Sequence, residues 1–459
     1  MSDPANLWQQ GHLLDVDVVD LSDRGDGVAR WGDRVIFIPD TVPGDRLQVR
    51  LTHVKPQYAH AKLVELLTPS PQRIRPRCIV ADKCGGCQWQ HIDDAAQGEA
   101  KVNLLTQALQ RIGGFQDLAI APLLSGDPLH YRNKATYPLS RSSHNQGVQA
   151  GYYRKGTHQV VNLNQCPVQD QRLDPLLAEV KQDIASQGWS IYNEERHQGR
   201  LRHLALRIGR RTGEMLLTLV STEETLTNIE EQAQAWMTRY PDLVGVCINH
   251  NPQRNNIIFG PDTYTIAGRS YLAEQFAGLT LHLRPETFFQ VNTEVAEQLL
   301  GVIERQLQLQ GNEVLLDAYC GIGTFTLPLA RQVQRAIGVE SQATAITQAK
   351  ANAKLNNIQN VQFYAQTVES WVYDREGIAD VVILDPPRKG CDRTVLDSLL
   401  RLQPARIVYV SCKPSTLARD LQHLCSTGQY KIEHIQPADF FPQTPHGEAV
   451  AFLERVTAE

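Results

Sequence analysis

The 459-residue sequence has no long hydrophobic run, and its first residues, MSDPANLWQQGH, contain no basic flank followed by an apolar stretch. A membrane span needs about 20 consecutive apolar residues, so we expect no membrane association. Without an export signal, we expect a cytoplasmic protein. The sequence also has no internal repeat and no low-complexity tract. Its 42% hydrophobic and 21% charged residues are typical of a globular protein with several domains.

The sequence also has no excess of positive charge, because its net charge is −5. This value argues against a uniformly basic nucleic-acid binder. The distribution is uneven, however, with thirteen Lys or Arg against six Asp or Glu between residues 130 and 211. Tyrosines are interleaved with these charges. This mixture is typical of a surface that contacts phosphates and stacks on bases. It is equally typical of the solvated face of a small β-sheet. The residues are Arg132, Lys134, Arg154, Lys155, Arg200, Arg202, Arg207, Arg210 and Arg211, with Tyr131, Tyr137, Tyr152 and Tyr153.

The N-terminal and central parts differ in their sequence patterns. Short alternating segments separated by Gly, Pro and Asp predict a five-strand β barrel over residues 8–68. A linker rich in Pro and Arg follows at 68–77. Residues 75–280 mix helical patterns, at 94–111 and 223–239, with strand-like runs such as RHLALRIG. We therefore expect a central α+β domain.

From residue 285 onward, apolar strands alternate with amphipathic helices, which predicts a Rossmann-like, doubly wound and mostly parallel sheet over 285–459. In LLDAYCGIGTF, a strand runs into Gly321 and Gly323, and the next strand ends in Glu340, whose carboxylate suits ribose hydroxyls. The third glycine of a dinucleotide site is absent. A ligand with adenosine but no phosphate fits better, and S-adenosylmethionine is the common one.

Several strands of this predicted sheet end in reactive side chains. Asp317, Glu340, Asp385 and Cys412 would all open on the same edge, where ligands of α/β sheets bind. Two prolines stiffen the turn after Asp385, and Cys412 lies between an apolar strand and a helix start. Glu448 precedes the final strand, so its carboxylate could reach the same place as a general base. We therefore expect a reactive thiol at Cys412.

Nine cysteines without an export signal are expected to be thiols, metal ligands or catalytic groups rather than disulfides. The stretch CIVADKCGGC contains Cys78, Cys84 and Cys87, and Cys166 precedes a proline further on. Four thiolates suit either zinc or an iron–sulfur cluster. The spacing matches neither a standard zinc ribbon nor the plant ferredoxin run, so both metals remain open on the residues alone.

Taken in order, the motifs FFQVN, DAYCGIGTF, DPPRKG, VSCKPSTLARD and FPQTPHGE resemble those of the RNA uracil-5-methyltransferase family. The N-terminal barrel is similar to a TRAM domain, and the cysteines resemble those of the bacterial 23S ribosomal RNA members that carry a cluster. The resemblance implies S-adenosylmethionine as cofactor and 23S rRNA as substrate, and we expect a monomer. It also implies a 4Fe-4S cluster held by Cys78, Cys84, Cys87 and Cys166.

The resemblance likewise assigns roles to residues of the C-terminal part. It makes Cys412 the nucleophile and Glu448 the base. Lys413 follows Cys412 where the family usually has Asn, and a cation there could help to hold the thiolate. The implied cofactor contacts are Gln290, Tyr319, Thr324, Glu340 and Asp385.

Three other functions remain open on the sequence. One is uracil-5 methylation of tRNA. A second is methylation of an exocyclic amine, suggested by the likeness of DPPR to the NPPY-type motif. The third is a non-catalytic RNA-binding protein with an iron–sulfur cluster.

Overall fold

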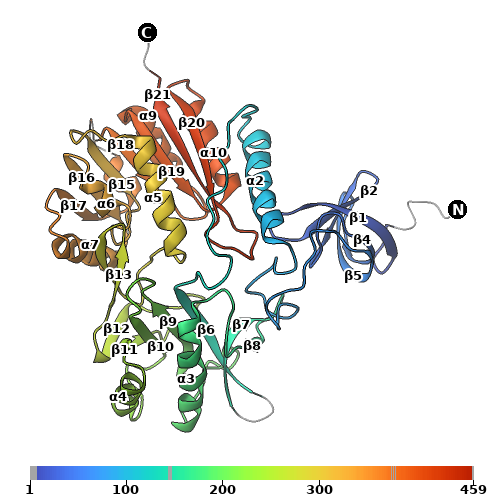
Figure 1. The fold of residues 1–459 in the computed structure, drawn as a ribbon, viewed down its shortest axis with the longest axis horizontal. Coiled ribbons are helices and arrows are strands. Elements are labelled where there is room, and N and C mark those ends of the chain that lie inside the picture. Colours follow the sequence, from blue (N-terminus) through green and yellow to red (C-terminus); the bar gives the residue numbers. More distant parts are fainter. Residues whose placement is uncertain (1–7, 143–146, 374, 376, 378, 457–459) are drawn as a thin grey trace.

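The computed structural model describes residues 8–142, 147–373, 375, 377 and 379–456. Figure 1 shows an N-terminal barrel to one side, a central sheet with helices below, and a C-terminal α/β part above. Within the described residues, no helix combines the length and apolar character that crossing a membrane requires.

The N-terminal part is a closed five-strand barrel in the order β1-β2-β3-β5-β4. Side chains alternate between inside and outside along β1, where Leu14, Val16 and Val18 are buried and the aspartates between them are exposed. The predicted five-strand barrel is therefore confirmed. Its strands are β1 (Leu13–Leu21), β2 (Gly27–Trp31), β3 (Arg34–Ile38), β4 (Arg46–Val54) and β5 (Tyr58–Thr68).

The central part contains a seven-stranded sheet in the order β12-β11-β10-β9-β6-β7-β8. Every residue of β9 is buried, because that strand lies inside the sheet. The second predicted helix begins at Ile229 rather than at residue 223, after Asn228 in a left-handed conformation. The strands are β6 (Lys134–Arg141), β7 (Val148–Tyr153), β8 (Val160–Asn162), β9 (Leu201–Ile208), β10 (Met215–Ser221), β11 (Leu243–His250) and β12 (Asp262–Gly268), with η1 (Gln171–Leu173), α3 (Asp174–Ser186) and α4 (Ile229–Arg239).

The C-terminal part is the predicted doubly wound sheet, in the order β17-β16-β15-β18-β19-β21-β20. Its first five strands are parallel, so their carboxyl ends meet at one edge, and β21 runs antiparallel beside β19. The strands are β15 (Val314–Ala318), β16 (Arg335–Glu340), β17 (Val361–Ala365), β18 (Val381–Leu384), β19 (Arg406–Ser411), β20 (Tyr430–Ala438) and β21 (Glu448–Arg455). The other elements are the hairpin β13 (Leu272–Phe276) and β14 (Leu279–Leu283), and the helices α5 (Thr293–Leu307), α6 (Thr326–Ala330), α7 (Ala343–Leu355), α8 (Val368–Val372), α9 (Arg393–Leu402) and α10 (Pro414–Cys425).

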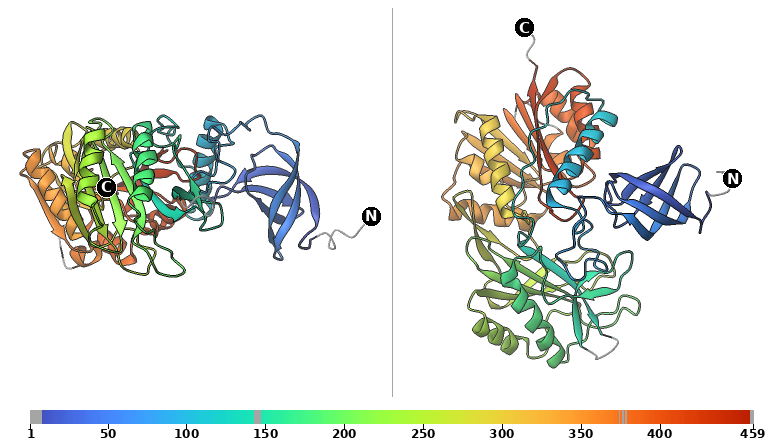
Figure 2. Two further views of the ribbon diagram at one scale, coloured as in Figure 1. Left: turned by 90° about the horizontal axis from the view of Figure 1, so that it is seen from below. Right: turned by 45° about the vertical axis from the view of Figure 1, so that its right-hand side comes forward.

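Helix α2 (Asp94–Arg111) lies where the sequence did not place it. Its Leu105 and Leu109 share one hydrophobic core with Tyr409 of β19 and Leu421 of α10, and Figures 1 and 2 show the helix beside the C-terminal sheet. The structure thus differs from the predicted boundary, which assigned this helix to a central domain over 75–280. An amphipathic pattern requires an apolar partner without specifying which one.

Candidate active site

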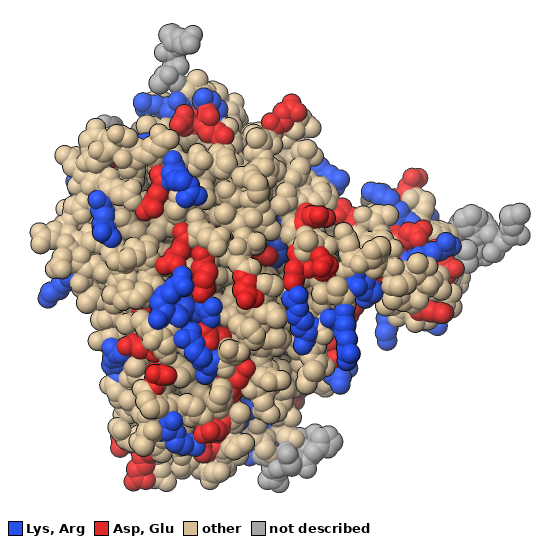
Figure 3. Space-filling model, in the orientation of Figure 1, with Lys and Arg blue, Asp and Glu red and all other residues tan. Residues whose placement is uncertain are grey.

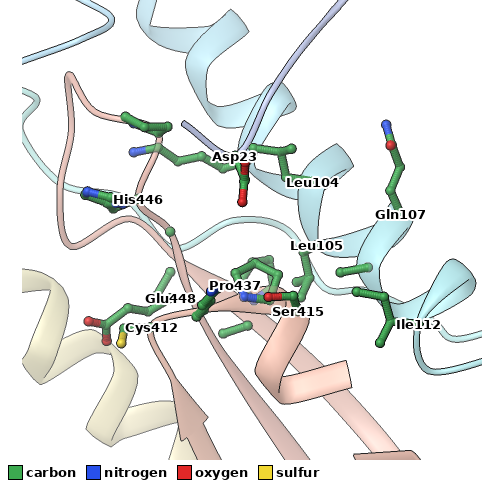
Figure 4. A pocket seen from close by; sticks show the side chains of 18 of the residues that line it. Asp23, Leu104, Leu105, Gln107, Ile112, Cys412, Ser415, Pro437, His446 and Glu448 are labelled. Carbon is green, nitrogen blue, oxygen red and sulfur yellow. The ribbon is translucent and has the colours of Figure 1, made fainter. Parts of the chain in front are cut away.

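Cys412 and Glu448 line one cavity of about 440 Å³. Cys412 follows β19 directly, and Glu448 is the first residue of β21. In Figure 4 the sulfur of Cys412 and the carboxyl group of Glu448 lie next to each other at one end of this cavity. The structure therefore brings together the two residues that the sequence proposed as nucleophile and base.

The barrel, helix α2 and the C-terminal sheet all contribute to the catalytic cavity, as we call this space. Helix α2 supplies Leu104 and Leu105, and the barrel supplies Asp23 from the loop between β1 and β2. Sequence reasoning missed these residues, because they converge only through the packing of α2 and the barrel. The remaining lining residues are Lys101, Gln107, Ala108, Arg111, Ile112, Leu123, Arg388, Lys413, Pro414, Ser415, Pro437, Ala438, Pro445, His446, Gly447 and Ala449.

Opposing effects act on the thiol of Cys412. Burial raises its pKa, and the negative charges of Glu448 and Asp385 raise it further. Arg388, from the DPPRKG motif, lowers the pKa. The sequence suggested Lys413 as the nearby cation; Lys413 does line the cavity, but the guanidinium that acts on the thiol belongs to Arg388. Because Cys412 also lies just before helix α10, the positive end of the helix dipole favours the thiolate.

The surroundings of Glu448 shift its carboxyl group toward the neutral form. Burial raises its pKa to about 8, the charge of Asp385 contributes to this increase, and Arg388 opposes it. A carboxyl group with a pKa near neutrality is suited to accepting a proton during a reaction and releasing it afterwards.

Buried carboxyl groups continue along the edge of the sheet. Burial raises the pKa of Asp317 and of Asp385 to about 7, and each also feels a neighbouring carboxylate. The hydroxyl of Thr326 donates a 2.5 Å hydrogen bond to Asp317. Within the described part of the chain, neither aspartate forms an ion pair. Uncompensated buried carboxyls favour a cationic ligand, so this edge fits the sulfonium and ammonium groups of S-adenosylmethionine.

The other predicted cofactor residues lie outside the catalytic cavity. Tyr319 follows β15 with a positive φ of 79°, and its hydroxyl is 4.0 Å from the sulfur of Cys391. Glu340 ends β16, where its carboxylate accepts hydrogen bonds from the two residues that follow. Thr324 is in the glycine loop, and Gln290 is buried just before α5. Their roles in cofactor binding stay predictions.

The four predicted cluster cysteines share a second cavity, of about 110 Å³. Cys78, Cys84, Cys87 and Cys166 all line it, and burial raises the pKa of Cys87 to about 11 and of Cys166 to about 12. Among the described residues, however, no group of three or more His, Cys, Asp or Glu side chains is arranged to hold a metal ion. The metal centre therefore stays a prediction.

The predicted basic surface of the central part is wrong for several of its residues. Arg202 is buried and donates to the carbonyl groups of three residues beyond β11, and Arg207 likewise donates to the carbonyls of Arg284 and Thr287. Arg210 is paired with acidic side chains. Tyr131 and Tyr137 are also buried. On the face shown in Figure 3, basic and acidic side chains are interspersed.

Comparisons with known proteins agree with this geometry. The family model for tRNA (uracil-5-)-methyltransferases matches residues 93–456, and the model for the TRAM domain matches residues 7–64. The TRAM match covers most of the five-strand barrel, and the first match includes α2 together with the central and C-terminal sheets.

Similar proteins extend over nearly the whole chain. One from Nostoc sp., described as an "Uncharacterized RNA methyltransferase", is 64% identical over 98% of this chain and 97% of its own. A protein of the same description from Synechocystis sp. is 56% identical over 98% and 97% of the two chains. The structure of Pyrococcus abyssi tRNA (uracil-54, C5)-methyltransferase in complex with S-adenosyl-L-homocysteine is 28% identical, with a TM-score of 0.77 over 96% of this chain and 100% of that chain.

Proposed function

Because the chain belongs to the tRNA (uracil-5-)-methyltransferase family, we propose that it methylates C5 of a uridine in RNA through Cys412 and Glu448. The observation that carries this proposal is the shared cavity, in which a thiol and a buried carboxyl lie side by side. An amine methyltransferase needs no such thiol, so the arrangement favours methylation at carbon.

The residues of the site account for each step at the base. C5 of uracil is a weak nucleophile, and addition of the Cys412 thiolate to C6 moves electron density to O4 and C5. S-adenosylmethionine, when bound, supplies the methyl group that C5 takes up. Glu448 then accepts the C5 proton, the C–H electron pair forms the C5–C6 double bond, and the C6–S bond breaks to return its electron pair to Cys412. The residues proposed to hold the cofactor are Gln290, Tyr319, Thr324, Glu340 and Asp385.

For the substrate we propose 23S rRNA, acted on by a cytoplasmic monomer, and the four cysteines support this choice through the family resemblance. A tRNA substrate is the second candidate, because the similar Pyrococcus abyssi protein is a tRNA (uracil-54, C5)-methyltransferase. Mapping 5-methyluridine in rRNA and tRNA from a strain that lacks this protein separates the two. Loss of the modification from tRNA alone would overturn the rRNA assignment.

A groove between the barrel and the central part is the proposed path for nucleotides beside the target. It has a volume of about 690 Å³, and its wall carries Tyr153 stacked on His158 together with the exposed Arg154. The lining also includes Asp26 of the barrel, which lies three residues from Asp23 of the catalytic cavity. A base can stack on the aromatic pair while Arg154 contacts a phosphate. The groove is also lined by Gly25, Pro39, Asp40, Gly85, Gly86, Gln88, Tyr152, Lys155, Gly156 and Thr157.

For the four cysteines we propose a 4Fe-4S cluster. Each cysteine of such a cluster binds a different iron, so the four thiolates need to surround a common space rather than meet at one ion. The cavity shared by the four thiols supports this choice. Anaerobic purification followed by an absorbance scan tests it. A brown protein is expected, and a colourless protein with stoichiometric zinc would overturn the proposal.

The decisive test of the reaction is the Cys412→Ala variant. We expect it to bind RNA and S-adenosylmethionine, to transfer no methyl group, and to form no covalent adduct with RNA containing 5-fluorouracil. The wild-type protein should form that adduct, because fluorine at C5 does not leave as a proton does. An active alanine variant would refute the mechanism.

A further inference from the structure

The loop between β20 and β21, residues 439–447, leads directly into Glu448 and is held by side chains that the proposed reaction does not use. Lys101, on α2, donates a 2.6 Å hydrogen bond to Oδ1 of Asp439 and a 3.1 Å hydrogen bond to the carbonyl of Phe441. The ion pair is buried, with side-chain exposures of 2% for Lys101 and 8% for Asp439. A Cβ placed on Gly447 would lie 3.6 Å from Cβ of Lys101. Lys101 therefore binds the beginning of the loop and lies beside its end.

A second set of contacts holds the middle of the loop. The side chains of Gln97 and Gln443 are linked, because the backbone N–H of Gln443 donates to Oε1 of Gln97 at 2.9 Å and Nε2 of Gln97 donates to Oε1 of Gln443 at 3.2 Å. The backbone N–H groups of Gln88 and Trp89 both donate to the carbonyl of Gln443. Gln443 has a φ of +70°, a conformation that costs free energy for a residue other than glycine. These bonds offset that cost and hold the loop in one shape.

The same loop touches the cavity that contains the four cysteines. The hydroxyl of Tyr131 donates a 3.1 Å hydrogen bond to the carbonyl of Pro442, and both Tyr131 and Thr444 line the cysteine cavity. Gln88, whose N–H group binds Gln443, is the residue after Cys87. The loop that ends at Glu448 is thus enclosed by α2 on one side and by the cysteine segment on the other.

We propose that Lys101, Gln97 and Gln443 are positioning residues that fix the loop 439–447 and thereby hold the carboxylate of Glu448 where it can reach the C5 proton. The inference rests on the proposed function, which makes Glu448 the base. A base must lie within hydrogen-bond reach of the proton that it removes. A displacement of about 1 Å at a reacting group can cost about 100-fold in rate.

The proposal predicts an effect on one step of the reaction only. Attack of Cys412 on C6 and transfer of the methyl group to C5 do not require Glu448. Removal of the C5 proton does, and the C6–S bond cannot break until that proton has left. A misplaced Glu448 therefore leaves the methylated base bonded to Cys412. A covalent protein–RNA adduct should then accumulate on ordinary uridine RNA, which a general loss of folding would not produce.

The test compares Lys101→Met, Lys101→Arg and Gln443→Ala with wild type, with Glu448→Gln as the reference and Arg239→Met as the matched control. Arg239 forms an exposed ion-pair cluster between α3 and α4, outside the catalytic cavity. For each variant, kcat, the affinity for S-adenosylmethionine by calorimetry, and the adduct on uridine RNA by denaturing gel are measured. We expect Lys101→Met and Gln443→Ala to lower kcat by about 10- to 100-fold and to accumulate the adduct. The affinity of these variants for S-adenosylmethionine should stay within about twofold of the wild-type affinity. Lys101→Arg should recover part of the kcat that Lys101→Met loses.

Each outcome decides the proposal. If Glu448→Gln accumulates the adduct but Lys101→Met and Gln443→Ala do not, the positioning role is refuted while the proposed function stands. If Glu448→Gln itself turns over normally, the assignment of the base fails, and the positioning role fails with it. Should Lys101→Met fail to fold, Gln443→Ala decides, because it leaves no buried charge unpaired.

Discussion

Cys412 and Glu448 are neighbours because β19 and β21 pair in antiparallel register. Ser411, the last residue of β19, lies opposite Ala449, so the next residue outward on each strand reaches the same end of the pair. This strand pairing therefore brings the nucleophile and the base to the same end of the sheet, and the loop 439–447 leads into the base.

We expect kcat to rise with pH up to about pH 8. Burial raises the pKa of Glu448 to about 8, and only the ionised carboxylate can accept the C5 proton. Below this pKa, kcat should fall about tenfold per pH unit, and a bound cation would move the midpoint to lower pH. Measuring kcat from pH 5.5 to 9.5 at saturating substrates checks the prediction. A flat profile for the wild-type protein would contradict it.

Glu448→Gln should stabilise the protein without its ligands at alkaline pH. The pKa of this carboxyl is about 8 in the fold against an ordinary value of 4.5, so the protonated form is favoured in the native state. The stability that this provides is complete below the ordinary pKa and is lost as pH rises through the native pKa. We expect the variant to melt a few degrees higher than wild type at pH 9, and at the same temperature near pH 4.5.

The matched control for this stability measurement is Glu433→Gln. Glu433 is more exposed and forms an ion pair with Lys431 on β20, so its removal should change the melting temperature little at either pH. Equal melting temperatures for Glu448→Gln and wild type at pH 9 would contradict the prediction. They would show that the ionised carboxyl group does not lower the stability of the folded protein.

The edge of the C-terminal sheet could be predicted from the sequence because strand and helix periodicity alone place it. Once five strands are parallel, the residues at their carboxyl ends must lie along one edge, as Asp317, Asp385 and Cys412 do. The position of Glu448 could be predicted for the same reason, since a final strand beside β19 brings its first residue to that edge.

The partners of polar and amphipathic segments could not be predicted in this way. In LRHLALRI, the charged side chains of Arg202 and Arg207 are typical of exposed residues, yet carbonyl groups from distant loops satisfy their guanidinium groups inside the protein. Lys101 on α2 is buried for a similar reason, because its partner Asp439 is 338 residues away in the sequence. A count of charges along the chain contains no information about such contacts.

Arg388→Met should make Cys412 less reactive at neutral pH. The guanidinium of Arg388 lowers the pKa of Cys412 and of Glu448, so its removal should raise both. Iodoacetamide alkylates the thiolate, and its rate with Cys412 should fall about threefold to tenfold at pH 7.5 and approach the wild-type rate at higher pH. Lys413→Asn is the comparison variant, since we expect its alkylation profile to stay close to wild type. An unchanged profile for Arg388→Met would contradict the role of Arg388.

Arg154→Ala should weaken RNA binding without changing the chemical step. Arg154 is exposed in the groove beside the barrel and forms no ion pair among the described residues, whereas its neighbour Lys155 is paired with Asp40. If Arg154 contacts one phosphate, its loss should reduce the slope of log affinity against log salt by about one and raise KM about fivefold. Filter binding at several salt concentrations, together with kcat at saturating RNA, measures both effects. Arg239→Ala, on the distant helix α4, should leave affinity and slope unchanged, and an Arg154→Ala variant with the wild-type slope would place the RNA elsewhere.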